Sequence, residues 1–440
     1  MGSVDWCGVV KGSALLPVLA AGLTPLLLIG LLIVGSTLGL VLWRPPVLWT
    51  DQFGDQDATS NVGHLAAGDS GIYASGFLNT NGTPVGNAFI RKYRADGALV
   101  WTTMIPANSA LFTTGISLAS DGIYIIGDSV SYTLLKYNFD GILLWSKLAE
   151  PSVELSAIFA TPTNVYAGLT NVTFYGRPIV YVREYDAQGN VIWTSQFPNS
   201  TSIVSSVMGI YVGAPEVLIL TGLALVAYSL DGSELWAHAF GSPGLVYPLS
   251  ITGDSTGVYV SGMVRLNGLS PATGFLTKYD FDGNTVWDTA FYSPDQGGVG
   301  FTAVSADSSG IYLSMASGRV HDFVQKYDSK GSRVWSFETP LMPKDDFLVA
   351  TGPNGFYLAG STGSSQGGWT KALVQAFSGF NSLVFFGINP PFSFAILGSL
   401  IAAAVLSIIF LRRRYARLMS RHPKSTSNDR YFKRGGTPPD

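Results

Sequence analysis

Residues 278 to 287 read KYDFDGNTVW, and the frame of this phrase recurs along the chain. In each of six copies a glycine stands four residues after the tyrosine and a tryptophan stands eight residues after it. The copies are Tyr93, Gly97 and Trp101; Tyr137, Gly141 and Trp145; Tyr185, Gly189 and Trp193; Tyr228, Gly232 and Trp236; Tyr279, Gly283 and Trp287; Tyr327, Gly331 and Trp335. Such constant spacing indicates one local geometry that the chain builds repeatedly.

A second phrase occurs seven times, upstream of each copy and once more near the end of the repeats. It is clearest in GIYIIG (122–127) and GVYVSG (257–262), and it is blurred in EVLILTG (216–222). The tryptophans recur every 43 to 52 residues. Self-similarity at this period indicates supersecondary units that stack because none of them can bury its apolar face alone.

Each unit resolves into four short runs. In the unit that ends near Trp287 these are PLSITGD (248–254), GVYVSGM (257–263), GFLTKYD (274–280) and TVWDTAF (285–291). Their length and their Val, Ile, Tyr, Phe and Trp content are typical of strands, and the Asp, Asn and Gly between them suit tight hairpins. Seven repeats of four strands predict an all-β chain folded as a seven-bladed β-propeller.

The two ends of the repeat region complete each other. The last unit contains KALVQAF (371–377), with Phe377 in the tyrosine position, but no tryptophan run follows it. The segment PVLWTDQFG (46–54) supplies Trp49 with no unit before it. We therefore expect the N-terminal strand to complete the last blade, which closes a propeller over residues 46–378 without an open edge.

The combination GxYxxG followed by KYDxxGxxxW resembles the Beta-propeller repeat (SBBP) family and, more distantly, the tryptophan-docking repeats of pyrroloquinoline-quinone-type propellers. The resemblance covers about residues 46–378 and concerns the fold rather than the function. It implies that the tyrosines and tryptophans are structural, with each tryptophan wedged between neighbouring blades. The tryptophans concerned are Trp49, Trp101, Trp145, Trp193, Trp236, Trp287 and Trp335.

Long apolar segments flank the repeats. Residues 14–43 and 390–411 carry no charge, and each segment is long enough to cross a bilayer as a helix. We therefore predict two transmembrane α-helices, the first a signal anchor, together with a short N-terminus (1–13) and a basic tail (412–440). An alternative is that residues 1–25 form a signal peptide that is removed.

The charge of the chain is divided between its parts. Residues 411–440 have a net charge of +7 and residues 1–44 of +1, which leaves −11 for residues 45–410 out of a total of −3. A basic flank marks the cytoplasmic side of a membrane helix, so we expect both termini in the cytoplasm and the propeller outside the cell. Anionic lipid explains the basic tail, and no nucleic-acid partner is predicted.

Cysteine usage and sequons indicate the kind of cell. Cys7 is the one cysteine, so no disulfide can form within the chain, and a surface domain without disulfides favours an archaeal or bacterial source. Sequons at Asn81, Asn171 and Asn199 predict glycosylation and favour an archaeal envelope.

Strand order predicts which face points away from the membrane. If the strands of a blade are called A to D from the axis outward, the A–B and C–D turns are short and share one face. The longer B–C and blade-to-blade loops share the other face. The N-terminal segment enters a D strand and the C-terminal segment leaves a C strand, both at the tight turns. We therefore expect the tight turns to face the membrane and the loops, with all three sequons, to face away.

Catalytic signatures are absent from the sequence. His64, His238, His321 and His422 are isolated, and no zinc, nucleophile-elbow or P-loop pattern occurs. DFDG (280–283) lacks the further carboxylates of a calcium loop and reads as a C–D turn. We predict no enzyme, no metal and no cofactor. The alternative is a propeller enzyme that uses the axial funnel, a hydrolase or a quinoprotein-like dehydrogenase. The resemblance to quinoprotein repeats implies eight blades and, in many such enzymes, a quinone stacked on a ring formed by adjacent cysteines, whereas seven blades are predicted here and Cys7 is the one cysteine.

Recognition remains as the predicted function. We expect a membrane-anchored, cell-surface propeller that binds an extracellular glycan, peptide or envelope protein. Aromatic and acidic residues in the distal loops are the candidate contacts. They are Tyr175, Tyr247, Tyr292, Trp369, Asp55, Asp57, Asp295 and Asp345. Converging carboxylates on the A strands would favour the enzyme, and a neutral funnel with an aromatic distal rim would favour binding. The sequence does not indicate the oligomeric state.

Overall fold

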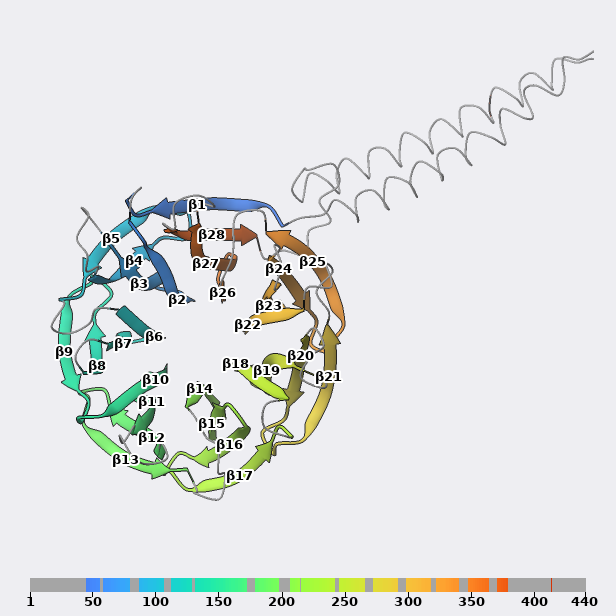
Figure 1. The fold of residues 1–440 in the computed structure, drawn as a ribbon. Coiled ribbons are helices and arrows are strands. Elements are labelled where there is room, and N and C mark those ends of the chain that lie inside the picture. Colours follow the sequence, from blue (N-terminus) through green and yellow to red (C-terminus); the bar gives the residue numbers. More distant parts are fainter. Residues whose placement is uncertain are drawn as a thin grey trace, which may run out of the picture. The chain divides into compact units, whose positions relative to one another are not determined.

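The computed structural model has its strands arranged as seven blades around a central axis (Figure 1). Each blade is an antiparallel sheet of four strands, which confirms the predicted seven-bladed β-propeller. The structure describes residues 45–55, 58–79, 87–106, 112–128, 131–171, 179–197, 206–213, 215–241, 245–265, 272–291, 298–317, 322–339, 347–363, 370–378 and 413.

The strands of each blade run outward from the axis in the order A, B, C, D, and in the first six blades that is also chain order. Blades 1 to 4 are formed by β2 (Asn61–Gly68), β3 (Gly71–Leu78), β4 (Asn87–Tyr93) and β5 (Leu99–Met104); β6 (Phe112–Ala119), β7 (Gly122–Asp128), β8 (Thr133–Tyr137) and β9 (Leu143–Leu148); β10 (Val153–Ala160), β11 (Asn164–Asn171), β12 (Ile179–Asp186) and β13 (Val191–Gln196); and β14 (Val207–Gly213), β15 (Glu216–Thr221), β16 (Ala224–Ser229) and β17 (Glu234–Ala239). Blades 5 to 7 are formed by β18 (Val246–Asp254), β19 (Gly257–Val264), β20 (Thr273–Tyr279) and β21 (Thr285–Phe291); β22 (Val299–Asp307), β23 (Gly310–Ser317), β24 (Asp322–Tyr327) and β25 (Arg333–Thr339); and β26 (Leu348–Gly352), β27 (Gly355–Gly363), β28 (Thr370–Ser378) and β1 (Val47–Phe53).

Burial changes across each blade in step with the sequence pattern. The A strands, next to the axis, keep partial exposure along most of their length, as in β2. The B strands are covered on both faces by neighbouring blades, which is why β7 reads as the nearly continuous apolar run GIYIIGD. The D strands alternate between exposed and half-buried residues, as in β9, because only one of their faces meets the next blade.

The connections divide the propeller into two faces. A–B turns such as Asp69–Ser70 and C–D turns such as 94–98 lie together on what we call the tight-turn face. The B–C and blade-to-blade connections must lie at the other end of the same antiparallel strands, and we call this end the loop face. The structure therefore keeps the two classes of connection apart in the way that the strand order predicts.

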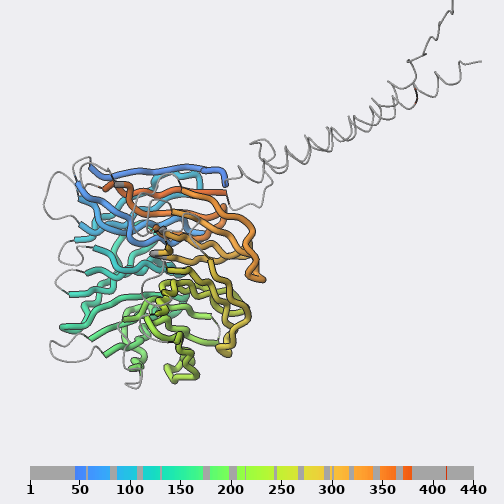
Figure 2. The backbone as a smooth tube through the Cα atoms, turned by 45° about the vertical axis from the view of Figure 1, so that its right-hand side comes forward, coloured from blue at the N-terminus to red at the C-terminus, as the bar shows by residue number. Residues whose placement is uncertain are grey.

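The N-terminal strand closes the ring as predicted. β1 pairs with β28 in antiparallel register from Val47 opposite Phe377 to Phe53 opposite Ala372. Just outside this ladder, the Ser378 amide donates to the Pro46 carbonyl at 3.1 Å. The start of β1 and the end of β28 therefore lie side by side on the tight-turn face of blade 7 (Figure 2). Every blade then has four strands, and no A–B–C unit is left with an open outer edge.

The predicted spans 14–43 and 390–411, the N-terminus and the basic tail lie outside the described residues, apart from Arg413. In the part of the chain that the structure describes, no helix has the length and apolar character that a bilayer crossing requires.

Candidate binding surface on the loop face

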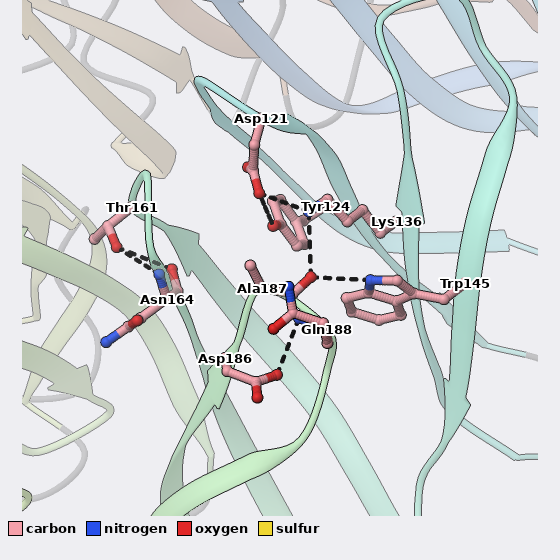
Figure 3. Close-up of polar contacts among 9 residues, drawn as sticks. All are labelled: Asp121, Tyr124, Lys136, Trp145, Thr161, Asn164, Asp186, Ala187 and Gln188. Atoms are coloured by element: carbon pink, nitrogen blue, oxygen red, sulfur yellow. Dashed lines mark hydrogen bonds and ion pairs between the residues drawn. The ribbon is translucent and has the colours of Figure 1, made fainter.

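The repeated residues join one blade to the next on the tight-turn side. The Trp145 indole N–H of blade 2 donates to the Ala187 carbonyl in the C–D turn of blade 3 at 3.1 Å. The Lys136 ammonium donates to the same carbonyl at 3.2 Å and pairs with Asp121 at 2.6 Å (Figure 3). One carbonyl of blade 3 thus accepts hydrogen bonds from two strands of blade 2.

The same indole contact recurs around the ring. In each case a tryptophan N–H donates, over 2.9 to 3.1 Å, to a carbonyl in the C–D turn of the following blade. The pairs are Trp49 with Ala95, Trp101 with Phe139, Trp193 with Leu230, Trp236 with Phe281, and Trp287 with Ser329. The first pair joins blade 7 to blade 1, so the closing strand makes the same contact as an internal D strand.

The turn glycine makes room for this tryptophan. Gly232 has a φ of +86°, and a Cβ atom added to it would lie 2.7 Å from the ring of Trp193 in the preceding blade. Only glycine combines a left-handed backbone with so close an approach at low energetic cost. The constant spacing of tyrosine, glycine and tryptophan is therefore explained by packing between blades.

Sequence reasoning gave no role to a fourth repeated residue, the lysine before the tyrosine. Lys92, Lys136, Lys278 and Lys326 each place the ammonium 4.9 to 5.5 Å from the ring centre of a B-strand tyrosine in the same blade. Burial alone would lower the pKa of Lys136, but its hydrogen bond to Asp121 leaves that pKa raised. The sequence contained a signal, because a charged residue recurred inside an otherwise apolar C strand.

These contacts lie on the tight-turn side, and a different group of side chains lies on the loop face. The strand ends of blades 1 to 3 bring together a group of side chains there, which we call the loop-end cluster: Phe77, Phe112, Asp128, Tyr132 and Glu154. Phe112, the first residue of β6, is 44% exposed and stands opposite Asp128, the last residue of β7. The ring of Phe77 in blade 1 lies 6.3 Å from that of Phe112.

The two acidic residues of the cluster, Asp128 and Glu154, interact electrostatically with Tyr132. Desolvation raises the pKa of Tyr132 to about 12, and the charges of Asp128 and Glu154 add to this effect. Desolvation also raises the pKa of Asp128, although a hydrogen bond from Tyr132 opposes the shift. Glu154, the second residue of β10, is exposed. The cluster therefore offers an open aromatic ring beside carboxylates, which suits hydroxyl groups or a cationic side chain.

The axial region carries little charge. The described A strands contain no Lys or Arg, and their acidic residues are Glu154 at the loop end with Asp254 and Asp307 at the tight-turn end. His64 on β2 donates from Nε2 to the Thr113 carbonyl of β6 at 3.1 Å. Desolvation lowers the pKa of His64 to about 4, so this neutral imidazole joins two blades.

Of the residues predicted to bind a ligand, the structure describes Asp55 and Tyr247. Asp55 is exposed and follows β1 in blade 7. Tyr247 is half-buried in β18 of blade 5, with the Arg265 guanidinium 5.7 Å from its ring centre. The structure therefore places these two residues on different blades. The others lie outside the described residues, namely Tyr175, Tyr292, Trp369, Asp57, Asp295 and Asp345.

Of the sequons and the remaining histidines, the structure describes Asn171 and His238. Asn171 is the last residue of β11, and its buried Oδ1 has no hydrogen-bond partner among the described residues. His238 on β17 packs against Tyr279, with the ring centres 5.0 Å apart. Asn81, Asn199, His321 and His422 lie outside the described residues.

The DFDG segment forms the C–D turn of blade 5. The Asp280 carboxylate accepts hydrogen bonds from the Asn284 backbone amide at 2.8 Å and from its side-chain amide at 3.1 Å. These bonds use Asp280 to stabilise the turn. Across the described ranges, no group of three or more His, Cys, Asp or Glu residues is arranged to hold a metal ion.

Comparison with known proteins shows no family for this chain. No protein-family model matches the chain, and no curated protein matches it. A β-propeller domain of the Trilobed protease from Pyrococcus furiosus, with an open velcro topology, is 8% identical over 73% of this chain and 94% of that domain, with a TM-score of 0.47.

Two further solved structures are similar at the same level. The WD40 domain of Neurospora crassa Pan2 is 9% identical over 76% of this chain and 98% of that domain, with a TM-score of 0.46. A protein of unknown function from Bacteroides caccae is 14% identical over 60% of this chain and 93% of that chain, with a TM-score of 0.41. Similarity at this level carries no argument about activity.

Proposed function

We propose that this protein is a membrane-anchored, cell-surface β-propeller that binds an extracellular glycan, peptide or envelope protein through its loop face. One observation carries the proposal: the two ends of the propeller meet on the tight-turn face, at Pro46 and Ser378, and the variable loops lie at the opposite ends of the strands. A chain that enters and leaves through one face leaves the other free for a partner.

The anchoring part of the proposal rests on the sequence. Residues 14–43 and 390–411 carry no charge, and a run of three arginines, 412–414, follows the second segment. An apolar segment of this length with a basic flank is typical of a membrane helix whose flank is cytoplasmic. Two such helices place both termini in the cytoplasm and the propeller outside, in an archaeal or bacterial envelope.

The loop-end cluster supports a polar ligand. Phe112 presents an exposed aromatic ring, and Glu154 and Asp128 lie close enough to Tyr132 for their charges to raise its pKa. Aromatic rings stack on the apolar faces of sugars and on aliphatic stems, and carboxylates accept hydrogen bonds from hydroxyl or ammonium groups. We therefore place the ligand contact at blades 1 to 3.

The axial region favours binding over the enzymatic alternative. Converging carboxylates would suit hydrolysis or quinone chemistry, whereas Glu154 lies at the loop end of its A strand and the other described A-strand acids, Asp254 and Asp307, lie at the tight-turn ends. Asp254 is engaged with Tyr259 at 2.6 Å and Thr256 at 2.7 Å. This distribution supports a binding module as the proposal.

Limited proteolysis of intact cells tests the topology. One epitope tag is inserted in the loop around Asn81 and another is added after Asp440. The proposal expects loss of the loop tag while the tail tag survives. Loss of the tail tag alone would invert the topology and remove the surface-binding proposal.

A ligand screen with matched variants tests the loop face. The full-length chain, purified in detergent, is applied to glycan and cationic-peptide arrays. For a captured ligand, Phe112→Ala is expected to weaken binding about tenfold, since truncation of an aromatic anchor costs about 1–2 kcal/mol. Leu148→Ala is the control, because Leu148 is also exposed in blade 2 but lies on its outer strand. Equal affinities in both variants would rule out the loop-end cluster as the contact.

A further inference from the structure

A row of aliphatic side chains encircles the propeller at the tight-turn end. In all seven blades the residue before the docking tryptophan is Leu, Val or Ile, and it is 47–54% exposed. These residues, which we call the apolar collar, are Leu48, Val100, Leu144, Ile192, Leu235, Val286 and Val334. They stand among the first residues of the D strands, which form the outer ring of the propeller (Figure 1).

The continuous apolar ring is found at this end of the D strands; at the loop end only Met104 and Leu148 are exposed large apolar residues among the described D strands. Two residues further towards the loop face, on the same side of each strand, every blade has a small or polar exposed residue. These residues are Thr50, Thr102, Ser146, Thr194, Ala237, Asp288 and Ser336. A ring of small and polar residues therefore follows the aliphatic ring on the outer wall of the propeller.

The collar is also uneven around the circumference. In blades 7, 1, 2 and 3 a second exposed aliphatic residue precedes each collar residue, whereas blades 4, 5 and 6 have Glu234, Thr285 and Arg333 in that position. The additional aliphatic residues are Val47, Leu99, Leu143 and Val191. All seven blades have the same fold, so the repeat geometry does not require this pairing.

Negatively charged residues are most frequent in the C–D turns of the blades that lack the second aliphatic residue. The C–D turns of blades 4 and 5 carry Asp231, Glu234, Asp280 and Asp282, with no Lys or Arg within residues 229–234 or 280–285. In blade 1 the Asp96 carboxylate in the same turn is neutralised by Arg94 at 3.1 Å. The C–D turns of blades 2 and 3 carry one carboxylate each, Asp140 and Asp186. The rim at blades 4 and 5 is thus the more acidic side, and the rim at blades 7, 1, 2 and 3 is the more aliphatic side.

The position of the chain ends identifies what the aliphatic side meets. Only residues 44–46 separate the first apolar segment from Val47, the first residue of β1. Three extended residues span about 10 Å at most. If residues 14–43 cross the membrane, blade 7 and its collar residues are held beside the bilayer, and blades 1 to 3 continue the same rim.

We propose that the aliphatic side of the collar, on blades 7, 1, 2 and 3, rests in the interfacial layer of the lipid bilayer, with the propeller tilted so that the acidic rim of blades 4 and 5 faces water. This inference depends on the anchoring that we propose above. A lipid surface fits better than a second copy of the chain, because the short link keeps this rim at the bilayer whether or not another copy is present. Exposed aliphatic groups gain free energy when lipid removes them from water.

Depth-dependent fluorescence quenching tests the proposal on the full chain in lipid vesicles. Cys7 is replaced by Ser, and single cysteines at Leu144, Leu148 or Val286 are labelled with a nitrobenzoxadiazole dye. Nitroxide lipids of the headgroup region serve as quenchers. Leu148 is the matched control, because it is an exposed leucine on the same strand, β9, but at the loop end. Circular dichroism verifies that each variant is folded.

The expected result is loss of more than half of the emission at position 144, little loss at 148 and an intermediate or small loss at 286. Equal quenching at 144 and 148, or none at 144, would overturn the proposal. A blue shift at 144 without nitroxide quenching would overturn it in favour of a protein partner. Carbonate extraction separates the two proposals: a chain that stays in the membrane with position 144 unquenched rejects the collar contact alone, whereas an extracted chain rejects the anchoring itself.

Discussion

At the residue scale, the tyrosine, glycine and tryptophan of the repeat are parts of one joint between blades. The tryptophan donates to the next blade, the glycine of that blade admits the indole ring, and the repeat tyrosine of that blade packs on the same ring, as Tyr93 does on Trp49 with ring centres 5.4 Å apart. Each residue type is required by a different physical demand, which explains why all three recur at fixed spacing.

Substitution of two glycines distinguishes the effect of backbone strain on stability from the effect of packing. Gly232 and Gly241 have φ values of +86° and +85°, but only Gly232 would press a Cβ against a tryptophan ring. We expect Gly241→Ala to lower the free energy of unfolding by about 1 kcal/mol from the left-handed backbone alone. We expect Gly232→Ala to lower it by about 2–3 kcal/mol, because displacement of the ring adds to that cost.

Denaturant unfolding of the purified variants measures both values. Gly63→Ala is the control, since a Cβ at Gly63 has no atom within 4 Å and φ is not positive; its stability should stay within about 0.5 kcal/mol of the parent. Equal losses at Gly232 and Gly241 would contradict the packing explanation.

His64 predicts a pH dependence of stability. Its pKa in the folded chain is lowered to about 4 by desolvation, whereas an unfolded histidine titrates at about 6.5. Between these pH values His64 binds a proton in the unfolded chain but not in the folded chain, so the free energy of unfolding falls as the pH falls. We expect a loss of roughly 1–2 kcal/mol between about pH 7.5 and about pH 4 from this group, allowing for the part of the ring that water reaches.

The measurement is the difference between the parent and His64→Gln across that pH range, because carboxylates titrate alike in both chains. Glutamine keeps a donor for the Thr113 carbonyl, which accepts from His64 at 3.1 Å, but it does not titrate. A constant difference between the two stability curves from about pH 7.5 to about pH 4 would show that His64 keeps an ordinary pKa.

At the element scale, the closing strand is held by more than its ladder. Asp51 on β1 accepts hydrogen bonds from Arg91 at 2.9 Å and from Tyr93 at 2.7 Å, both on β4 of blade 1. Arg91 also lies over the ring of Phe53 on β1, 3.7 Å from its centre. β1 therefore belongs to blade 7 by backbone pairing and is joined to blade 1 by side chains.

Asp51→Asn tests this side-chain contact. The substitution keeps the shape but removes the charge that Arg91 pairs with, and we expect a loss of about 1–2 kcal/mol in the free energy of unfolding because the pair is half-buried. Asp96→Asn is the control: the Arg94–Asp96 pair has a similar distance, but both side chains are largely exposed, so a clearly smaller loss is expected. Chemical denaturation measures the free energy of unfolding of both variants. A larger loss for Asp96→Asn than for Asp51→Asn would contradict the role given to the Asp51–Arg91 contact.

Blade 7 also shows how an element adapts when the repeat is interrupted. Its C and D strands come from opposite ends of the chain, so it has no continuous C–D turn. Aromatic rings gather around the preceding tryptophan: Phe356 lies 5.7 Å from Trp335, and Phe377 stacks on Phe356 at 4.9 Å with an interplanar angle of 6°. This aromatic stack packs blade 6 against blade 7.

At the scale of the whole molecule, we expect folding of the propeller to require β1, because β1 closes the ring by pairing with β28. A chain that lacks residues 1–44 keeps β1, whereas a chain that lacks residues 1–54 exposes the whole edge of β28 and the turn glycine Gly97 that faces Trp49. We expect the first deletion to leave the propeller folded. The second removes a full ladder and should cost a large part of the roughly 5–15 kcal/mol that stabilises a domain.

Size-exclusion chromatography and thermal unfolding, with the second apolar segment also removed from both chains, compare the two deletions. The shorter deletion should give a monodisperse protein with one cooperative transition, and the longer one should give aggregates or no transition. Cooperative unfolding after loss of β1 would mean that the ring does not depend on its closing strand.

The sequence by itself determined the number of blades, the strands of each blade, the closing strand and the division into two faces. These features follow from local spacing and from alternation, since the polarity of a strand is set by the faces that its neighbours cover. The bounds differ little: the predicted run 248–254 is β18, Val246–Asp254, in the structure.

The tertiary structure alone decided which side chains meet. Phe77 and Phe112 are 35 residues apart in the chain and touch because two blades pack together. The role of the buried lysines can be seen only in the structure, where Lys136 reaches its partners Asp121 and the Ala187 carbonyl. The physical reason is that spacing along a strand is fixed by the backbone, whereas contacts between blades depend on how two separately built sheets twist and pack against each other.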